Sequence, residues 1–226
     1  PPPPNDPPPP DPPPPAQEPP PPPANEPPPV EPPPPPPDVP QNQEPLLSIL
    51  ISEVQITGGS GKTTNDFVEL YNPNSEAINL KGYRLVKRTA DATSDTLLKS
   101  WTVDAFIPAH GFYLWANSDY GDIPVPADVT TSGSLADMNG VALRFGPNDT
   151  GEIVDSLAWG EVTNGFAEGS ALPGGLTALQ SYERKASGCA AAASGSGNGC
   201  DTDNNASDFD VRSVAEPQNS ASAPEI

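Results

Sequence analysis

Proline is concentrated at the start of this chain: residues 1–45 hold 28 of the 36 prolines among 226 residues. The same segment has no lysine, arginine or aromatic residue. A segment of this composition cannot bury enough apolar surface to offset the entropy of folding, so we expect it to form no core of its own. Residues 46–226 remain, and they are enough for one well-buried domain.

The proline runs predict an extended polyproline II segment over residues 1–45. Consecutive prolines fix φ near about −65° and remove backbone donors, and at about 3.1 Å per residue the segment would reach roughly 140 Å. A collagen helix is excluded, because it needs glycine at every third position and this segment has none. Acidic residues interrupt the runs at irregular spacings and would surround such a rod. The segment is therefore either a solvated spacer or a rod that packs against other rods.

The chain is strongly acidic, with a formal net charge of −20. Seven acids in residues 1–45 contribute −7, and the remaining 23 acids and 10 bases contribute −13. This charge argues against nucleic acid or anionic lipid as a partner, and suits solubility, divalent cations or a basic partner. No run approaches 18 consecutive apolar residues, so we expect no membrane-spanning segment.

The only cysteines, Cys189 and Cys200, flank a loop rich in Ala, Ser and Gly. No other residue of a metal-ligand type lies between them, so a local disulfide is favoured over two unpaired thiols. It would stabilise the fold by about 2–3 kcal/mol and pin a surface loop without holding the core. A disulfide implies an oxidising compartment, and a chain that opens on Pro1 without Met is expected to be a mature product. We therefore expect a secreted protein of the extracellular cell surface.

From residue 47 onward, short apolar runs alternate with turn signals, and no helical period is convincing. This pattern predicts an all-β fold, an antiparallel sandwich or barrel. The nine predicted strands are 47–56, 67–71, 78–87 with a kink at Gly82, 97–103, 112–116, 141–145, 153–159, 179–184 and 209–214. We divide the chain into a stalk (1–45), one domain (46–220) and a C-terminal tail (221–226).

Several of these runs together resemble one family. They are ISEVQI at 51–56, DFVELYNPNSEAINLKGYRLV at 66–86, IPAHGFYLWA at 107–116, EIVDSLAWG at 152–160, SYERK at 181–185, DTDNNASDF at 201–209 and a closing PQNS. In this order they resemble the lamin tail domain, over about residues 47–220. The resemblance implies an immunoglobulin-like β-sandwich, which occurs in nuclear lamins and in many secreted bacterial proteins. The family has no common catalytic site, so the resemblance implies a non-enzymatic protein.

No coiled-coil heptads precede the domain, so a nuclear intermediate filament is not expected. The proline stalk and the disulfide point to the bacterial, extracellular branch of the resemblance. In such a sandwich the family motifs supply the core. The residues expected to point inward are Val68, Leu70, Leu85, Leu114, Val141, Leu143, Val154 and Leu157, with Trp101, Trp115 and Trp159 filling the centre or capping the ends.

Two features suggest catalysis only superficially. The run TGGSGKTT at 57–64 lacks the first glycine of a phosphate-binding loop, because Ile56 stands there, and a strand follows where a helix is needed. We interpret it as a hairpin loop. His110, the only histidine, lies in the turn PAHG, with no concentration of partner residues for a nucleophile or a metal. We expect it to be an exposed turn residue.

Asp201, Asp203 and Asn205 place oxygen ligands at alternate positions, as the start of a calcium loop does. The continuation departs from that motif, because Ala206 stands where glycine is needed and Arg212 where a bidentate Glu is needed. Calcium at these three residues is thus a weak candidate, and Asx turns that tie the loop to the last strand are the alternative. No other cofactor is expected. Asn148 and Asn205 each begin an N-glycosylation sequon.

Two functions remain open. The first is a structural subunit of an extracellular filament or other assembly, in which the chain self-associates and the stalk packs with neighbours. Arg84, Lys87 and Arg88, on one predicted strand, are then candidate partners for a neighbour's acids. The second is an adhesin or other binding module held off the cell by a passive spacer. An accessory domain of a larger secreted hydrolase fits less well.

Overall fold

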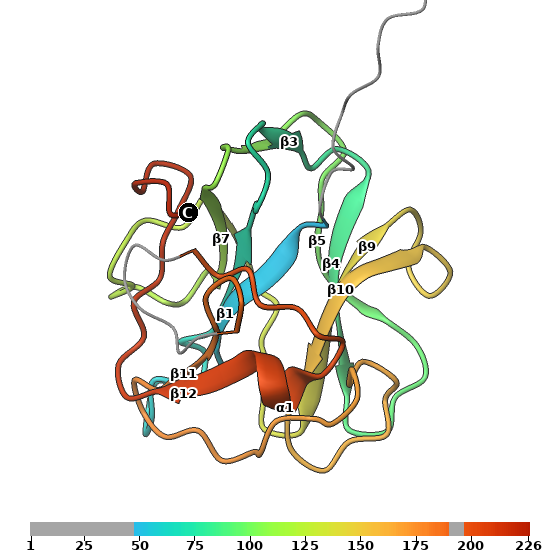
Figure 1. Ribbon diagram of the computed structural model, residues 1–226. Coiled ribbons are helices and arrows are strands. Elements are labelled where there is room, and N and C mark those ends of the chain that lie inside the picture. Colours follow the sequence, from blue (N-terminus) through green and yellow to red (C-terminus); the bar gives the residue numbers. More distant parts are fainter. Residues whose placement is uncertain (1–47, 190–196) are drawn as a thin grey trace, which may run out of the picture. The chain divides into compact units, whose positions relative to one another are not determined.

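The computed structural model describes residues 48–189 and 197–226 (Figure 1). The chain divides into two units, Pro1–Asn42 and Gln43–Ile226, and the description below concerns the second. The predicted polyproline II stalk lies outside the described residues. In the part that is described, twelve strands and one short helix form the fold.

The larger sheet has six strands, in the order β12-β11-β1-β2-β7-β8. Their bounds are β1 Leu50–Gln55, β2 Phe67–Tyr71, β7 Phe112–Asn117, β8 Val129–Thr131, β11 Ser181–Arg184 and β12 Phe209–Arg212. The pairings are antiparallel, as predicted, except that β8 runs parallel to β7. This short edge strand was not predicted, because three residues between long loops carry no period that a sequence pattern can reveal.

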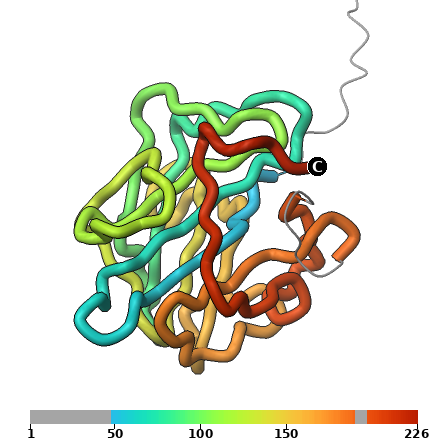
Figure 2. The backbone as a smooth tube through the Cα atoms, turned by 90° about the vertical axis from the view of Figure 1, so that its left-hand side faces the viewer, coloured from blue at the N-terminus to red at the C-terminus, as the bar shows by residue number. Residues whose placement is uncertain are grey.

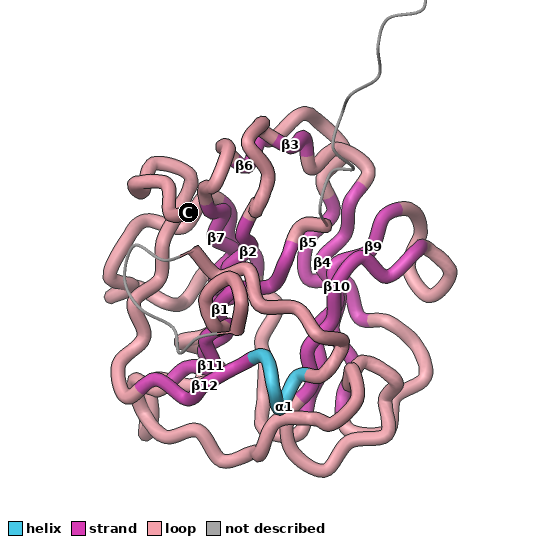
Figure 3. The backbone as a smooth tube through the Cα atoms, viewed as in Figure 1, coloured by secondary structure: helices cyan, strands magenta, loops and turns pink. Residues whose placement is uncertain are grey.

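The smaller sheet has four strands, β5 Thr96–Ser100, β4 Tyr83–Thr89, β9 Asn139–Phe145 and β10 Glu152–Ala158, in the order β10-β9-β4-β5. A two-stranded ladder joins β3 Ile78–Asn79 to β6 Phe106–Ile107. The predicted strand 78–87 is thus divided in two, because Gly82 adopts φ +92° in a turn where the N–H of Tyr83 donates to Leu80 O. Helix α1, Asn205–Asp208, is a single turn (Figure 3).

The two sheets share one apolar core, consistent with an immunoglobulin-like β-sandwich. Nine of the eleven predicted core residues lie in it and are buried: Val68, Leu70, Leu85, Val141, Leu143, Leu157, Trp101, Trp115 and Trp159. Leu114 is buried on the opposite face of β7, beside Phe67 and Ala116, so its assignment to this core was wrong. Val154 packs against the core, as predicted, but is only partly buried.

Residues 215–226, here called the C-terminal segment, run over the outer face of the six-stranded sheet (Figure 2). Ala215 packs there against Phe67 and Leu114. The residues that the sequence suggested as a separate tail are held to the domain: Tyr71 Oη donates to Glu225 O at 2.6 Å, and Glu225 N donates to His110 O at 2.8 Å. Both faces of this sheet are therefore covered along β1 and β2, and every residue of those two strands is buried.

Candidate functional site

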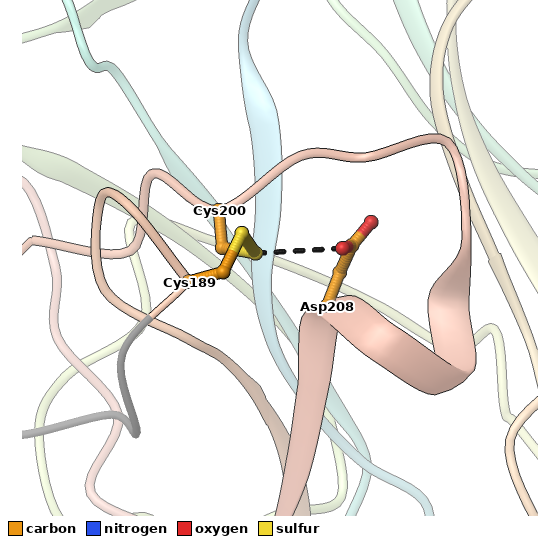
Figure 4. A group of neighbouring side chains, drawn as sticks. All are labelled: Cys189, Cys200 and Asp208. Carbon is orange, nitrogen blue, oxygen red and sulfur yellow. Dashed lines mark hydrogen bonds between the residues drawn. A yellow bond between two sulfur atoms is a disulfide. The ribbon is translucent and has the colours of Figure 1, made fainter.

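The two cysteines lie next to the helix, where the structure joins Cys189 to Cys200 in a disulfide (Figure 4). Cys200 is buried and its sulfur lies 3.4 Å from Asp208 Oδ1. Among the described residues, these two sulfurs and Asp208 are the one group of three Cys, His or acidic side chains close enough to share a metal ion. Because the sulfurs are bonded to each other, they are not thiolate ligands, and the group is not a metal site.

We expect mass spectrometry without reductant to show a linked Cys189–Cys200 peptide. Reduction should lower the melting temperature, since opening this 11-residue separation costs about 2–3 kcal/mol on the chain-entropy model. Thiol alkylation of the native protein, before and after reductant, checks the pairing. Two thiols that react before any reductant is added would contradict it.

The three predicted calcium ligands serve different partners. Asp201 Oδ1 lies 3.7 Å from Arg184 Nη1, whereas Asp203 is exposed and adopts φ +55°. The loop they belong to is closed from inside by Asp208, whose Oδ2 accepts from Thr202 N at 2.9 Å. The loop also contains an Asx-type contact, because Asp201 Oδ1 accepts from Asp203 N at 3.4 Å, in line with the Asx-turn alternative. Calcium at these residues stays a prediction.

Asn205, the third of these ligands, is buried and braces two segments. Its Oδ1 accepts from Ala158 N at 3.2 Å and from Glu168 N at 3.1 Å, and its Nδ2 donates to Ser156 O at 2.9 Å. The amide nitrogen that a glycan would modify is therefore engaged in the folded domain. Asn148, in the turn between β9 and β10, is partly exposed, and glycosylation of either residue stays a prediction.

Arg184 on β11 is a fully buried charged residue, with a side chain that is 0% exposed. Its Nη2 donates to Asp155 Oδ2 on β10 at 2.7 Å. Its Nε donates to Ile51 O, and its Nη1 to Cys200 O, both at 2.8 Å. The guanidinium also lies over the ring of Phe209, 4.6 Å from the centroid. One arginine thus ties together the two sheets and the disulfide loop.

Asp155 on β10 is the acidic partner of Arg184. Its Oδ2 also accepts from the N–H of Ile51 at 2.5 Å. Burial raises the pKa of Asp155 to about 6, and Arg184 opposes this rise. Such a pair holds a fold in register but does not by itself perform chemistry, because each nitrogen of the guanidinium already donates to a partner inside the domain.

A second polar feature is a row of three glutamates across neighbouring strands, here called the carboxylate row. Glu53 on β1 lies opposite Glu183 on β11 and opposite Glu69 on β2. Directly opposed residues share one face of a sheet, and like charges there repel. Burial raises the pKa of Glu53 to about 8 and that of Glu69 well above its ordinary value. The repulsion is therefore relieved by protonation.

The C-terminal segment covers this row. Glu216 N donates to Glu53 Oε1 at 3.2 Å, and Gln218 N donates to Glu69 Oε2. Two residues further, Ser220 N donates to Asp128 Oδ2 at 3.0 Å. Alternate N–H groups of an extended segment thus meet side-chain carboxyls where a neighbouring strand would offer carbonyls. The carboxyl groups of Glu53, Glu69 and Asp128 thus hold the C-terminal segment against the six-stranded sheet.

Sequence reasoning missed the pairing of Arg184 with Asp155, and it missed the carboxylate row. The available signal was the placement of Glu53, Glu69 and Asp155 inside otherwise apolar strand motifs. A strand whose two faces are both covered has no solvent side on which an acid can lie. Acidic residues at these three strand positions are therefore expected to be buried and to have polar partners.

Two motifs that sequence analysis set aside take up structural roles. TGGSGKTT forms the loop of the β1–β2 hairpin, as predicted, and Lys62 pairs with Asp122 there. His110 is partly buried, so the expected exposure was wrong: it lies under the end of the C-terminal segment and adopts φ +50°.

The bases Arg84, Lys87 and Arg88 on β4 are occupied within the domain. Arg84 and Lys87 each donate to a loop carbonyl, and Arg88 Nε lies 2.8 Å from Asp95 Oδ1. All three side chains are partly buried. They are thus poorly placed to receive a neighbour's acids, contrary to the suggestion from the sequence.

One cleft of about 320 Å³ opens at the end of the four-stranded sheet. It is lined by Ser48, Ile49, Ile78, Tyr83, Phe145, Glu152, Ile153 and Val154. The rings of Tyr83 and Phe145 meet edge to face, with centroids 5.0 Å apart. A second, smaller cleft and an acidic one beside Glu183 hold no assembled set of catalytic groups within the described residues.

The architecture defines an all-β, predominantly antiparallel sandwich domain. Comparison with protein families places it further: the model of the Lamin Tail Domain matches residues 42–161, more than half of the chain. The chain belongs to the lamin tail domain family. The later motifs of the resemblance, from SYERK onward, lie beyond the matched residues but supply β11 and β12 of the larger sheet.

A solved structure supports the fold. The crystal structure of a DUF4876 family protein from Bacteroides thetaiotaomicron VPI-5482 is similar, with a TM-score of 0.51 and 10% identity, over 73% of this chain and 71% of that chain. At this identity the likeness concerns the fold alone. No curated protein matches the chain. In the part of the chain that the structure describes, no helix is long and apolar enough to cross a membrane.

Proposed function

We propose that this protein is a non-enzymatic structural protein of the extracellular surface, a subunit of a filament or other assembly in which residues 1–45 pack with neighbouring copies. The observation that carries the proposal has two parts. Residues 1–45 contain 28 prolines, and they are joined to a domain whose buried ionisable groups have their partners within its own fold. A folded domain joined to a stiff segment with few backbone donors suits assembly.

The buried ionisable groups support the non-enzymatic part of the proposal. A catalytic acid or base must have access to a reacting atom. Arg184, Asp155, Glu53 and Glu69 are instead covered, and each has partners inside the domain. The chain also belongs to the lamin tail domain family, whose members share no catalytic site. The disulfide supports the extracellular location, because such bonds persist in oxidising compartments.

The polyproline segment suits packing for a physical reason. Proline-rich chains lose little conformational entropy on docking, because their φ angles are already fixed, whereas a Gly/Ser linker loses much. The seven acids oppose close approach at low salt, so association should strengthen as salt screens them.

Deletion of residues 1–40 tests the proposal. We expect the full chain to form assemblies visible by electron microscopy in moderate salt, and the deleted chain to remain monomeric. A β-type circular dichroism spectrum with a cooperative melt is the control that the deleted chain is folded. Assemblies of unchanged geometry after the deletion would reduce the segment to a spacer and favour the alternative, an adhesin or binding module held off the cell.

A further inference from the structure

The cleft at the end of the four-stranded sheet is formed where three strands end side by side. Tyr83 begins β4, Phe145 ends β9 and Glu152 begins β10, and Phe145 lies in register with both of the others. Ile78, Tyr83 and Val154 pack against the main core from the inner side. Phe145 and Ile153 remain 50% and 41% exposed. The cleft is thus an aromatic and aliphatic surface left open at the rim of the core.

The lining residues of this cleft indicate which kind of ligand it can bind. Its walls combine aliphatic and aromatic side chains with polar atoms, and its one acid, Glu152, offers no counter-charge to an anion. The hydroxyl of Tyr83 makes no hydrogen bond within the described residues, and as a phenol it is a donor at neutral pH. The fitting occupant presents apolar rings and unpaired carbonyl acceptors, without requiring an opposite charge.

A polyproline run has these properties. Its carbonyls have no internal partners, its rings are apolar, and aromatic-lined grooves are the surfaces on which such runs dock. The longest uninterrupted run of this chain is Pro32–Pro37. A volume of 320 Å³ is near the lower limit for ligand pockets, which suits a few residues of the run at a time.

We propose that the cleft around Tyr83 and Phe145 binds a proline run from residues 1–45 of a second copy of this chain. The inference rests on the proposed function, and names the surface that receives the packing segment. Ser48, the first residue that the structure describes, lines the cleft. A segment of one copy that docks in the cleft of the next copy makes a head-to-tail contact. Contacts of this kind extend into open filaments unless the rotation closes a ring.

Full-chain variants test the cleft by sedimentation velocity over a range of concentrations. Phe145→Ser should weaken self-association at least about tenfold, because it removes a half-exposed apolar ring. Tyr83→Phe, which keeps the ring and removes the donor, should weaken it by about three- to tenfold. Val211→Ser, on β12 and 48% exposed, is the matched control and should leave association unchanged. Thermal melts check that all three variants are folded.

Photo-crosslinking identifies the occupant. A chain carrying Phe145→p-benzoylphenylalanine is mixed with an isotope-labelled second copy, and the crosslinked product is weighed and sequenced by mass spectrometry. Crosslinks to residues 1–45 of the labelled copy support the inference. Crosslinks within one copy, or to the sandwich of the labelled copy, overturn it.

The two proposals fail in different ways. If Phe145→Ser associates like the parent chain while deletion of residues 1–40 abolishes association, the cleft is not the receiving surface and the structural function stands. If deletion of residues 1–40 leaves association unchanged, the proposed packing of the segment fails, and the inference about the cleft falls with it.

Discussion

Replacing Arg184 by Met should destabilise the domain by about 3–5 kcal/mol, the cost of leaving one member of a buried ion pair without its partner. The substitution abandons Asp155 in the interior and removes the donors to Ile51 O and Cys200 O. For a domain of this size the melting temperature should fall by roughly 10 °C or more.

Thermal or denaturant unfolding of the full chain measures this effect. Lys81→Met is the matched control, because Lys81 is 59% exposed and pairs with Asp104 at the surface, where an ion pair contributes at most about 1 kcal/mol. Adding Asp155→Asn to Arg184→Met should recover part of the loss, since it neutralises the stranded acid and keeps an acceptor for Ile51 N. An Arg184→Met melt equal to that of Lys81→Met would contradict the assigned role.

The strand pattern of the domain was predictable, because half-buried strands alternate visibly and turns carry Gly, Pro and Asn. The segment 67–71 was predicted with the bounds of β2, and the resemblance anticipated the family. The edge strand β8 and the break at Gly82 could not be predicted. The first depends on a long loop that returns to the sheet, and the second depends on a single backbone angle.

The candidate site was less predictable than the fold. Asp201, Asp203 and Asn205 are close in sequence, so they were noticed, but Asn205 turns inward to brace Ser156. Arg184 and Asp155 are 29 residues apart, and only the packing of two sheets brings them together. Nor could spacing show that the outer face of β1 is covered, because that depends on where the last residues of the chain lie.

Acidification should stabilise this protein between about pH 8 and pH 5, contrary to the usual behaviour of carboxylates in ion pairs. Burial raises the pKa of Glu53 to about 8, of Asp66 and Glu168 to about 7, and of Asp155 to about 6. The unfolded chain binds these protons only near pH 4, so the folded state carries more protons across this interval. Stability is then lost as pH rises through the folded-state pKa values.

The carboxylate row should dominate this dependence. Glu53 faces Glu183 and Glu69, whereas the nearest cation, Arg212, lies 2.8 Å from Glu183 and only partly offsets the repulsion. We expect the melting temperature to be at least about 5 °C higher at pH 5 than at pH 8, since each kcal/mol shifts it by about 2–4 °C.

Glutamine variants locate the effect in the row. Glu53→Gln with Glu69→Gln keeps amide oxygens as acceptors for the N–H groups of Glu216 and Gln218 but removes the two titrations. Its melting temperature should vary much less between pH 5 and pH 8 than that of the parent, because the neutral amides no longer pay for ionisation in the interior. Glu76→Gln, at an exposed position, should retain the parent's dependence. A parent melting temperature that rises with pH would contradict the prediction, and an unaltered slope in the double variant would place the titrating groups elsewhere, at Asp66 or Glu168.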